Sequence, residues 1–486
     1  MSVDIGKQNY FTRLTISYAE KRWLLILLDL LALNGGLILS IALRPDYTLR
    51  GRLLLQNPIW FLLLNSLWFF IGYLAQVYDL EKASQFPNGL IGVFSVGLIC
   101  QGIFNAIPYL APRLPESRSN LFIVILIPVC CLLVGRIIFL LVFSRSEFRR
   151  RVIIVGAGWA GKTIFNTVKE HGKSLYQLVG FIDDDPGKFG STVEITEEFD
   201  EELLPHPTAL TVIGRSKDLL KIIEQYHVTT IVMAITQDVS GELYQYLADC
   251  LQYGIEIIPM PVLYEQLTGK VPVEHMGDHW SVSMPLEHPG TSVIWHATKR
   301  IFDVVWSLIG SVVLILLFPW IALAIILDSP GPIIYTQIRL GRNGKPYPLY
   351  KFRSMVADAE RGQAVWAKKN DPRMTRVGRF LRRTHLDEFP QFVNILKGDM
   401  SVVGPRPERP ELVEKLAEQI PFYRVRLAVK PGMAGWGLIH KGYGASQDAA
   451  LEKLQYDLYY IKHQSLWLDL YILGRTFIDA ITFGGR

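Results

Sequence analysis

Four long apolar stretches fill the first third of the chain and constrain its fold more than any other feature. They cover residues 23–43, 59–78, 90–111 and 121–143. Each has about the 20 residues that an α-helix needs to cross the hydrocarbon core of a bilayer. A cleaved signal peptide does not explain the first stretch, which is too long, lacks a small-residue cleavage site and is followed by three more. We expect a four-helix transmembrane bundle over residues 1–148.

The composition agrees with a membrane protein whose apolar excess is confined to part of the chain. Of 486 residues, 50% are hydrophobic and only 20% are charged, which is unusual for a soluble globular protein. The 50 basic and 45 acidic residues balance too evenly to indicate a nucleic-acid partner. The four cysteines form no CxxC pair, so neither a disulfide framework nor a zinc site is predicted.

Basic residues flank the bundle: Lys7, Arg13, Lys21 and Arg22 precede it, and Arg145, Arg149, Arg150 and Arg151 follow it. The positive-inside rule places both flanks in the cytoplasm, as four crossings require. The loop after the first stretch carries Arg44, Arg50 and Arg52, so the bias is incomplete. Asp29 and Arg136 lie within apolar stretches, and a pair that joins two helices is the simplest interpretation.

From residue 151 the pattern changes to short β-branched runs that alternate with amphipathic segments. The runs predict buried strands at residues 152–155, 178–182, 230–235 and 255–258. The segments predict helices that include residues 162–169, 217–226 and 242–253. Repeated βαβ units give a parallel sheet, so we expect an α/β, Rossmann-like middle domain over residues 149–290.

A glycine-rich turn follows the first of these strands. In VIIVGAGWAG, the glycines Gly156, Gly158 and Gly161 would allow a tight turn and close approach of a phosphate to a helix N-terminus. Asp183 ends the next strand, where a ribose-binding carboxylate belongs. A bound nucleotide is therefore one interpretation. The same turn also occurs in domains that bind nothing or only dimerise, and both interpretations stay open.

A fifth apolar stretch, residues 301–327, contains Pro319. A complete crossing here would put everything after it on the side opposite the middle domain. Because proline removes a backbone donor and kinks a helix, a re-entrant helix that enters the membrane, bends and returns is the alternative to a crossing. The remainder is basic and rich in tryptophan and tyrosine, which fits a domain on the bilayer surface. We expect residues 291–486 to form one α+β catalytic domain that includes this helix.

Two motifs in this domain could carry chemistry. KFRSM supplies Lys351 and Arg353 on what is predicted to be a strand, and the segment from RRTHLDEF to GPRP brings Arg382, Asp387, Glu388 and Arg406 within a short stretch. Adjacent carboxylates among arginines suit phosphoryl transfer, because cations neutralise the phosphates while a carboxylate holds a metal or acts as nucleophile. LDEF alone would be explained equally well by a surface salt bridge.

The order of the fifth stretch, KFRSM, LDEFPQ, GDMSVVGPRP and KPGMAGW resembles the polyprenyl-phosphate hexose-1-phosphate transferases over residues 294–486. The bundle and middle domain resemble the large form of this family. The resemblance implies an enzyme of the bacterial inner membrane with its soluble domains and both termini in the cytoplasm. It would transfer a hexose-1-phosphate from a UDP-sugar to undecaprenyl phosphate and release UMP. A homodimer is also implied, with no nucleic-acid partner.

The resemblance also assigns roles to single residues. Asp387 would attack the UDP-sugar and carry the phosphosugar, and Glu388 would ligate Mg²⁺. Phosphate or carboxylate positioning would fall to four cations: Lys351, Arg353, Arg382 and Arg406. The family usually has Ser-Pro at the helix kink, whereas this chain has Phe318 before Pro319.

Two other functions remain as alternatives. A membrane-anchored NAD-dependent nucleotide-sugar epimerase or dehydratase needs Tyr and Lys four residues apart on a helix. The match, Tyr347 with Lys351, has Pro348 between them, which disfavours a helix. The second alternative is an inactive membrane scaffold of glycan assembly.

If the middle domain is regulatory or dimer-forming, removal of residues 1–290 should leave measurable transfer. The pattern does not identify the sugar or the glycan.

Overall fold

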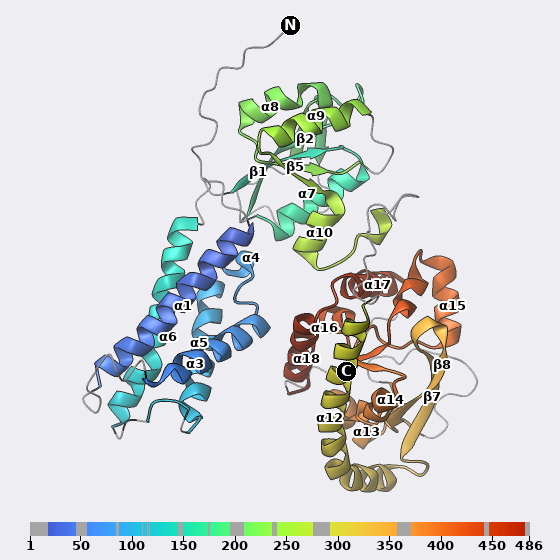
Figure 1. Ribbon diagram of the computed structural model, residues 1–486. Coiled ribbons are helices and arrows are strands. Elements are labelled where there is room, and N and C mark those ends of the chain that lie inside the picture. Colours follow the sequence, from blue (N-terminus) through green and yellow to red (C-terminus); the bar gives the residue numbers. More distant parts are fainter. Residues whose placement is uncertain are drawn as a thin grey trace. The chain divides into compact units, whose positions relative to one another are not determined.

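The computed structural model (Figure 1) divides into two compact units, Met1–Leu263 and Tyr264–Arg486. The predicted boundary at residue 290 lies outside the described residues, as do Lys7, Arg13, Arg50, Arg52 and Arg145. The described residues are 18–44, 56–83, 87–108, 110–113, 115, 117–143, 149–173, 175–194, 209–235, 241–275, 292–356, 371–441 and 447–481.

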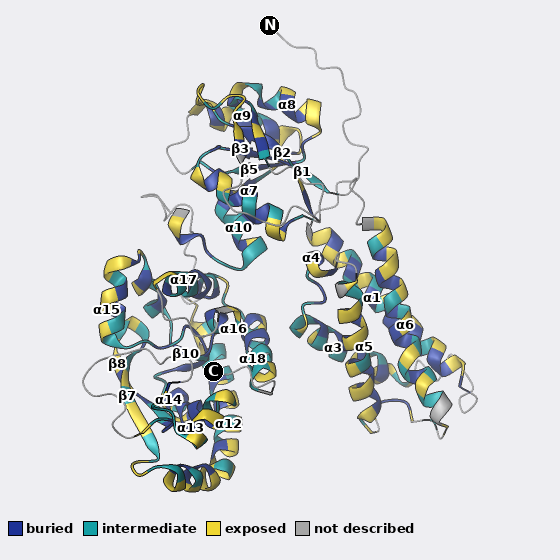
Figure 2. Cartoon of the chain, turned by 180° about the vertical axis from the view of Figure 1, so that it is seen from behind, coloured by how far each residue is buried: buried dark blue, intermediate teal, exposed yellow. Residues whose placement is uncertain are grey.

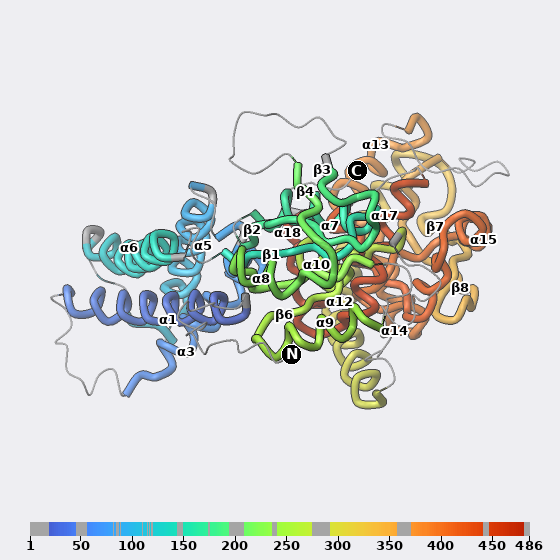
Figure 3. The backbone as a smooth tube through the Cα atoms, turned by 90° about the horizontal axis from the view of Figure 1, so that it is seen from above, coloured from blue at the N-terminus to red at the C-terminus, as the bar shows by residue number. Residues whose placement is uncertain are grey.

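The first unit begins with the predicted apolar helices: α1 (Tyr18–Ala42), α3 (Pro58–Leu74), α5 (Asn88–Ala106) and α6 (Arg118–Phe143), with the short α4 (Leu80–Ala83) between α3 and α5. By length and composition α1, α5 and α6 are each sufficient to cross a membrane, whereas α3 has 17 residues and is shorter. Helices α1 and α6 lie side by side in both views (Figures 1 and 3). The prediction of four apolar N-terminal helices is confirmed.

The two charges within the bundle pair with each other. Arg136 Nη2 donates to Asp29 Oδ2 at 2.7 Å, and Nη1 donates to the Val77 carbonyl oxygen at 3.2 Å. Both charged side chains are almost fully buried, at 2% and 1% exposed. Leaving either charge alone in this setting would cost several kcal/mol, roughly 3–5. The pair therefore fixes the register of α1 against α6, as the sequence predicted.

The first unit continues with a six-stranded mixed sheet of order β3-β4-β2-β1-β5-β6. All neighbouring strands are parallel except β3 and β4, which are antiparallel. The four predicted strands are present, and β3 and β4 are two that the sequence analysis missed. The antiparallel edge makes the sheet mixed where a parallel one was expected. The strands are β1 (Arg150–Val155), β2 (Tyr176–Ile182), β3 (Thr192–Glu194), β4 (Ala209–Gly214), β5 (Thr230–Met233) and β6 (Glu256–Pro259).

Amphipathic helices connect these strands, and the apolar core lies between them and the sheet. Ile153, Ile182 and Ile231 of the sheet are fully buried against Leu219 and Leu243 of the helices, and the central strands are dark blue in Figure 2. The alternation of buried strands and one-sided helices is what the sequence periodicity predicted. The helices are α7 (Trp159–His171), the 3₁₀ turn η2 (Ser216–Asp218), α8 (Leu219–Tyr226), α9 (Gly241–Gln252) and α10 (Met260–Thr268), which continues into the second unit.

The second unit is an α+β arrangement built on the long helix α12 (Val293–Asp328). An antiparallel hairpin of β7 (Ile334–Leu340) and β8 (Pro346–Phe352) is one of its two small sheets, and the other pairs β9 (Ser401–Val403) with β10 (Gly432–Ala434) in parallel. The remaining helices are α13 (Arg376–Arg383), α14 (Gln391–Lys397), α15 (Pro410–Gln419), α16 (Trp436–Lys441), α17 (Gln447–Lys462) and α18 (Leu466–Ile481).

Helix α12 spans 36 residues, and its ribbon turns sharply in its C-terminal part (Figure 1). Pro319 lies inside the helix and removes one backbone hydrogen bond there. Only 17% of the most apolar part of the helix is buried. Trp320, Leu316 and Leu327 are among the exposed side chains, each at two thirds exposure or more. The helix therefore leaves a continuous apolar surface without a protein partner among the described residues.

The N-terminal turns of α12 are polar and are bound to the rest of the unit. Lys299 Nζ donates to Asp469 Oδ2 of α18 at 2.5 Å. The Asp303 carboxylate accepts from Ser401 Oγ at 2.8 Å and from the Val402 amide at 3.0 Å, both in β9. Asp303 and Asp469 are buried, so these bonds compensate two desolvated charges. This end of α12 is thus anchored to β9 and α18.

The segment at the start of the unit packs on α16 and α17, more than twenty residues before the predicted domain boundary. Trp436 Nε1 donates to the Gly269 carbonyl oxygen at 2.9 Å. Lys270 Nζ pairs with Glu452 at 2.6 Å, and the Val271 amide donates to the Gln455 carbonyl oxygen at 3.1 Å. Residues 264–275, which end in the 3₁₀ turn η3 (Val273–His275), therefore form part of the C-terminal unit.

This packing predicts that a fragment of residues 264–486 is more stable than one of residues 291–486. The shorter fragment leaves the Trp436 indole and the Glu452 carboxylate without these partners. We expect its melting temperature in detergent to be lower by about 5–10 °C. Trp436→Phe, which removes the indole donor, should lower the melting temperature of the longer fragment by more than that of the shorter one, because the Trp436 ring also packs on Tyr459 and Tyr471 in both. Equal melting temperatures for the two fragments would contradict this assignment.

Candidate active site in the C-terminal unit

Asp387 and Glu388 lie on the 3₁₀ turn η6 (Leu386–Glu388) between α13 and α14. His385 precedes the turn with φ of 55°, a left-handed conformation that histidine tolerates better than most residues. The Glu388 amide donates to the His385 carbonyl oxygen at 3.2 Å and closes the turn. Both carboxylates are 6% exposed. The turn thus places two adjacent acidic side chains in the interior of the unit.

Two cations from separate elements bind the second carboxylate. Lys351 Nζ of β8 and Arg406 Nη2 of the segment after β9 each lie 2.8 Å from Glu388 Oε1. Charge-assisted hydrogen bonds of this length are strong, and here they bring together residues from three parts of the sequence. The structure therefore groups four of the predicted site residues: Lys351, Asp387, Glu388 and Arg406.

The two carboxylates have opposite pKa shifts. Burial and the adjacent Glu388 charge raise the pKa of Asp387 to about 6. Burial alone would also raise the pKa of Glu388, but Arg406 and Lys351 hold it well below its ordinary value. Burial likewise lowers the pKa of Lys351, although Glu388 opposes this shift. The site thus holds one firmly ionised carboxylate beside one that titrates near neutral pH.

Arg382 lies at the edge of this group. Its Nε donates to Ser354 Oγ at 3.0 Å, and its charge acts to lower the pKa of Asp387. Helix α13 reaches this position because Gly378 has no side chain, since a Cβ there would collide with the Ser354 carbonyl oxygen. Arg382 is therefore positioned near the carboxylates, as predicted, without a direct hydrogen bond to either of them.

Arg353 has a different role from the one that the sequence analysis assigned to it. Its Nη atoms donate to the carbonyl oxygens of Ser329 at 2.6 Å and Pro330 at 2.9 Å, and to Ser329 Oγ at 3.0 Å. Cations are favoured at helix C-termini, where carbonyl groups lack intrahelical partners. Arg353 therefore holds the end of α12 to the end of β8, and the structure does not bring it together with Glu388.

Asn394 is a site-forming residue that the sequence analysis missed. It is fully buried in α14, where Nδ2 donates to the Pro348 carbonyl oxygen at 2.7 Å and Oδ1 accepts from the Tyr350 amide at 3.1 Å. These bonds join α14 to β8 beside Lys351. An asparagine inside the apolar run FVNIL was the available signal, because a buried amide needs specific partners.

The bent part of α12 supports the same elements from the other side. Gly310 lets the Phe392 ring of α14 pack directly on the helix, since a Cβ at that position would collide with the ring. Further along, the Phe318 and Phe352 rings lie 5.7 Å apart. Leu314, Ile321 and Ile325 complete this core with Phe352 and Leu381. Helix α12 thus holds β8, α13 and α14, the three elements around Asp387 and Glu388.

Backbone packing between the GPRP and KPGMAGW motifs places Arg406. The Gly404 amide donates to the Ala434 carbonyl oxygen at 2.9 Å. A Cβ at Gly404 would collide with the Lys430 carbonyl oxygen, and one at Gly432 with the Gly404 amide. These glycines are therefore required for close approach of two backbone segments. The motif that contains Gly432 supports the site through Arg406.

The glycine-rich turn of the first unit is held by contacts with neighbouring residues of the same unit. Gly156 has φ of 106°, and a Cβ at Gly161 would collide with the Gly156 carbonyl oxygen. The Asp183 carboxylate accepts from the Ala157 amide at 2.8 Å and from Lys188 Nζ at 3.0 Å. Gly158 is different, because its Cβ position is open. Gly156, Gly161 and Asp183 thus have structural roles, and nucleotide binding stays a prediction.

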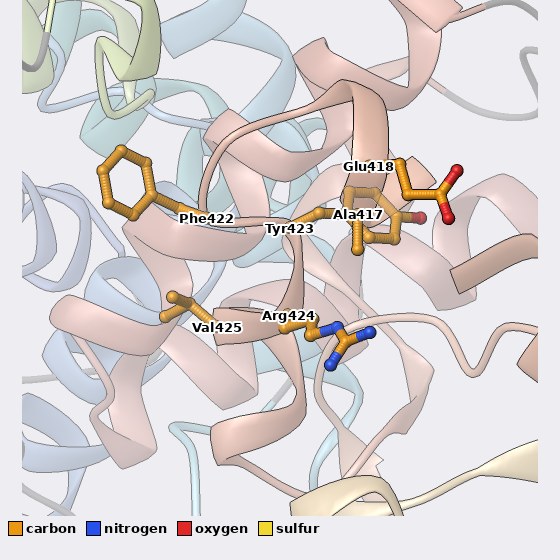
Figure 4. Close-up of a pocket in the computed structure, with 6 residues that line it drawn as sticks. All are labelled: Ala417, Glu418, Phe422, Tyr423, Arg424 and Val425. Atoms are coloured by element: carbon orange, nitrogen blue, oxygen red, sulfur yellow. The ribbon is translucent and has the colours of Figure 1, made fainter. Parts of the chain in front are cut away.

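The position of Tyr347 and Lys351 bears on the epimerase or dehydratase alternative. Tyr347 and Lys351 lie in strand β8, so they do not form the helical pair that an epimerase or dehydratase needs. The pocket in Figure 4, between α15 and the 3₁₀ helix η7 (Tyr423–Ala428), contains none of the predicted site residues. Among the described residues, no group of three or more His, Cys, Asp and Glu side chains could hold a metal ion.

Comparison with known proteins agrees with the geometry of the second unit. The model of the bacterial sugar transferase family matches residues 294–482. The exopolysaccharide production protein PSS of Rhizobium leguminosarum bv. phaseoli is 40% identical over 38% of this chain and 96% of its own length. Nearly all of that protein therefore aligns with a stretch of this chain that is about as long as the C-terminal unit.

Two larger relatives extend the similarity. The UDP-glucose:undecaprenyl-phosphate glucose-1-phosphate transferase of Klebsiella pneumoniae is 32% identical over 68% of this chain and 67% of its own. The UDP-N-acetylgalactosamine-undecaprenyl-phosphate N-acetylgalactosaminephosphotransferase of Aeromonas hydrophila is 39% identical over 51% of this chain. The chain covers only 58% of that relative's length. On these similarities, the chain belongs to the bacterial sugar transferase family.

Proposed function

We propose that this protein transfers a hexose-1-phosphate from a UDP-sugar to undecaprenyl phosphate and releases UMP, the first membrane step of polysaccharide synthesis. One observation carries the proposal: Asp387 and Glu388 are buried together beside Lys351 and Arg406. Such a site can neutralise a diphosphate and also present a carboxylate to it. The names of the relatives, which are undecaprenyl-phosphate sugar-phosphate transferases, support the same substrates.

In the first half-reaction, an Asp387 carboxylate oxygen attacks the phosphorus that bears the sugar. A phosphorus–oxygen bond forms to Asp387, the bond to the UMP oxygen breaks, and UMP leaves with that electron pair. Lys351, Arg406 and Arg382 would offset the charge that develops on the phosphoryl oxygens. The raised pKa of Asp387, to about 6, gives a carboxylate that is ionised at neutral pH and more basic than an exposed one.

In the second half-reaction, an oxygen of the lipid phosphate attacks the same phosphorus. The acyl-phosphate bond breaks, the Asp387 carboxylate is regenerated, and the product is a lipid-linked diphosphosugar. A covalent intermediate divides the transfer into two displacements at one site. The names of the two larger relatives make glucose and N-acetylgalactosamine candidates for the donor sugar. Galactose is a third candidate, because the undecaprenyl-phosphate galactose phosphotransferase of Salmonella typhimurium is 39% identical over 37% of this chain.

Mg²⁺ fits the donor set of the site. Mg²⁺ is commonly bound by one or two carboxylates, with waters and substrate phosphates as the remaining ligands. Glu388 is the proposed ligand, and its low pKa keeps it ionised. When bound, the ion would neutralise part of the diphosphate charge. In the structure two cations of the chain, Lys351 and Arg406, neutralise the Glu388 carboxylate itself.

We also propose that α12 is a re-entrant membrane helix. Its N-terminal turns are bound to β9 and α18 through Asp303 and Lys299, and its C-terminal end is bound to β8 through Arg353. Both attachments lie in one compact unit, whereas a spanning helix would have to separate them by a bilayer. The exposed apolar surface between them supports insertion into the membrane. The site would then lie where a cytoplasmic nucleotide and a lipid phosphate can both reach it.

The first unit is proposed to anchor and regulate the enzyme. The order of its five parallel strands, β4-β2-β1-β5-β6, agrees with a Rossmann-like domain. Placement in the bacterial inner membrane, cytoplasmic soluble domains and a homodimer remain part of this proposal. The inactive-scaffold alternative is disfavoured, because the carboxylates and two of their predicted cations are assembled in one buried site.

The proposal predicts lipid-dependent UMP release from one sugar nucleotide. Purified protein with Mg²⁺ and undecaprenyl phosphate should release UMP from UDP-glucose, UDP-galactose or UDP-N-acetylgalactosamine. Asp387→Asn should reduce the rate by about 10³-fold or more, because an amide cannot act as the nucleophile. Mass spectrometry of Asp387 after reaction without lipid should show the phosphosugar adduct. Folded wild-type protein that releases no UMP from any of the three would refute the proposed donors.

The same substitution should stabilise the protein at neutral pH. The fold raises the pKa of Asp387 from 3.8 to about 6, so its stabilising protonated form is lost as the pH rises through this interval. Asp387→Asn should therefore melt a few degrees higher than wild type at pH 8 and at the same temperature below pH 4. Glu388→Gln is the matched control and should lower the melting temperature at pH 8, because Glu388 is stabilised in its ionised form. A destabilised Asp387→Asn would contradict the assigned pKa shift.

The reaction rate should also depend on the ionisation of Asp387. Because only the carboxylate attacks, UMP release should fall as the pH drops through about 6. The measurement is kcat/KM for UMP release between pH 5 and pH 8, because this parameter reports the ionisation of the free enzyme. A rate that stays constant down to pH 5 would show that another group limits the reaction.

A further inference from the structure

The segment that carries Arg406 is held in an unusual way. Residues 405–408 read Pro-Arg-Pro-Glu, and neither proline has a backbone N–H to donate. The segment therefore depends on its carbonyl groups for attachment, and all four accept a hydrogen bond. The donors are the Gly432 amide to Pro405 at 2.9 Å, Arg426 Nη2 to Arg406 at 3.1 Å, Arg339 Nη1 to Pro407 at 3.2 Å and the Leu340 amide to Glu408 at 3.1 Å.

Arg426 is the donor that binds the Arg406 carbonyl group itself. Its side chain, on η7, is 5% exposed. Nη2 also donates to Asp457 Oδ2 of α17 at 2.8 Å, and Nη1 donates to Tyr423 Oη at 2.6 Å. A guanidinium group is planar and donates in several fixed directions, so three partners restrict its position more than one would. Arg426 is thus a rigid support under the backbone of Arg406.

Arg406 in turn reaches the buried carboxylates. Its own Nη2 lies 2.8 Å from Glu388 Oε1, while its carbonyl group accepts from Arg426. A displacement of this backbone by one ångström would move the guanidinium away from Glu388, and misplacements of this size can cost about 10²-fold in rate. The donor that binds the Arg406 carbonyl group therefore controls the position of the Arg406 guanidinium group.

We propose that Arg426 is a positioning residue that acts through Arg406, with Asp457 and Tyr423 fixing its orientation. This inference rests on the proposed function only in that Arg406 is taken to contact the diphosphate. Arg426 itself contacts the backbone of Arg406 and leaves the carboxylates to the Arg406 side chain. The role differs from general packing, because it predicts a specific energetic coupling between two arginines.

Arg300 provides a matched control. It is also a partly buried arginine whose two Nη atoms bind backbone carbonyl groups, those of Ile395 and Leu396, at 2.6 Å each. Its bonds hold the end of α14 and do not include residues 405–408. A substitution at Arg300 thus removes a similar set of hydrogen bonds without removing the support of Arg406.

The first experiment measures position without activity. In the full-length protein in detergent, hydrogen–deuterium exchange is followed at residues 401–409 and 391–398. Arg426→Lys keeps a charge for Asp457 but cannot bind Asp457, Tyr423 and the Arg406 carbonyl group together. We expect faster exchange at 401–409 in Arg426→Lys and at 391–398 in Arg300→Lys. Wild-type exchange at 401–409 in folded Arg426→Lys would overturn the proposal, whether or not the protein transfers sugar.

The second experiment measures the coupling through kcat for UMP release, with radiolabelled donor so that slow variants are measurable. Arg426→Lys should lower kcat about tenfold when Arg406 is present and less than about twofold in the Arg406→Gln background. Arg300→Lys should change kcat by the same factor in both backgrounds. An equal loss from Arg426→Lys in both backgrounds would show a general structural role. Absence of UMP release by wild type would count against the proposed function, while the exchange experiment would still decide the positioning.

Discussion

The C-terminal unit depends on the charge balance around two adjacent buried carboxylates. Taking carboxylates out of water costs several kcal/mol each unless cations and hydrogen bonds compensate. Lys351 and Arg406 come from β8 and from the segment after β9, so both elements must be in place before Glu388 is satisfied. Burial and the adjacent Glu388 charge raise the pKa of Asp387 to about 6, and the two cations that contact Glu388 oppose this rise only in part. The uneven compensation separates the two carboxylates into an ionised partner and a reactive group.

A second constraint is that α12 is bound to polar groups at both ends and exposes apolar side chains between them. Its ends are held by charged and carbonyl groups of one unit, through Lys299 and Arg353, while its middle exposes an apolar surface. One face of the bent part still packs on Phe352 and Leu381. The carboxylate site is therefore attached directly to the apolar surface. The elements that hold the carboxylates thus pack on the same helix that exposes the apolar surface.

Patterns that arise from burial were readable in the sequence, and those that depend on distant partners were not. Apolar length predicted the helices of the bundle, and short β-branched runs predicted the central strands. Strands β3 and β4 were missed; β3 has only three residues and lies at the edge of the sheet, where it pairs with β4 alone. Residues 264–275 were assigned to the middle domain, since nothing local shows that Gly269 binds Trp436. Long-range contacts of this kind leave no local periodicity.

The site shows the same division between local and distant information. The pairing of Lys351 and Arg406 with Glu388 agrees with the motifs. Arg353, two residues from Lys351, was expected beside it but turns to the end of α12 once β8 ends. Alternation along a strand is therefore a guide only while the strand continues. Asn394 carries no reactive chemistry, so the search for catalytic types passed over it.

The placement of the reactive groups finally depends on backbone contacts that only glycine and proline permit. Gly404 and Gly432 allow two backbones to touch, Gly378 does the same for α13, and Gly310 leaves room on α12 for the Phe392 ring of α14. Prolines on both sides of Arg406 restrict its backbone and leave its attachment to carbonyl groups. Side chains at such contacts could repack after a substitution, whereas a backbone contact has no alternative rotamer. The motifs around the carboxylates are thus explained as much by the rigidity they give as by the charges they carry.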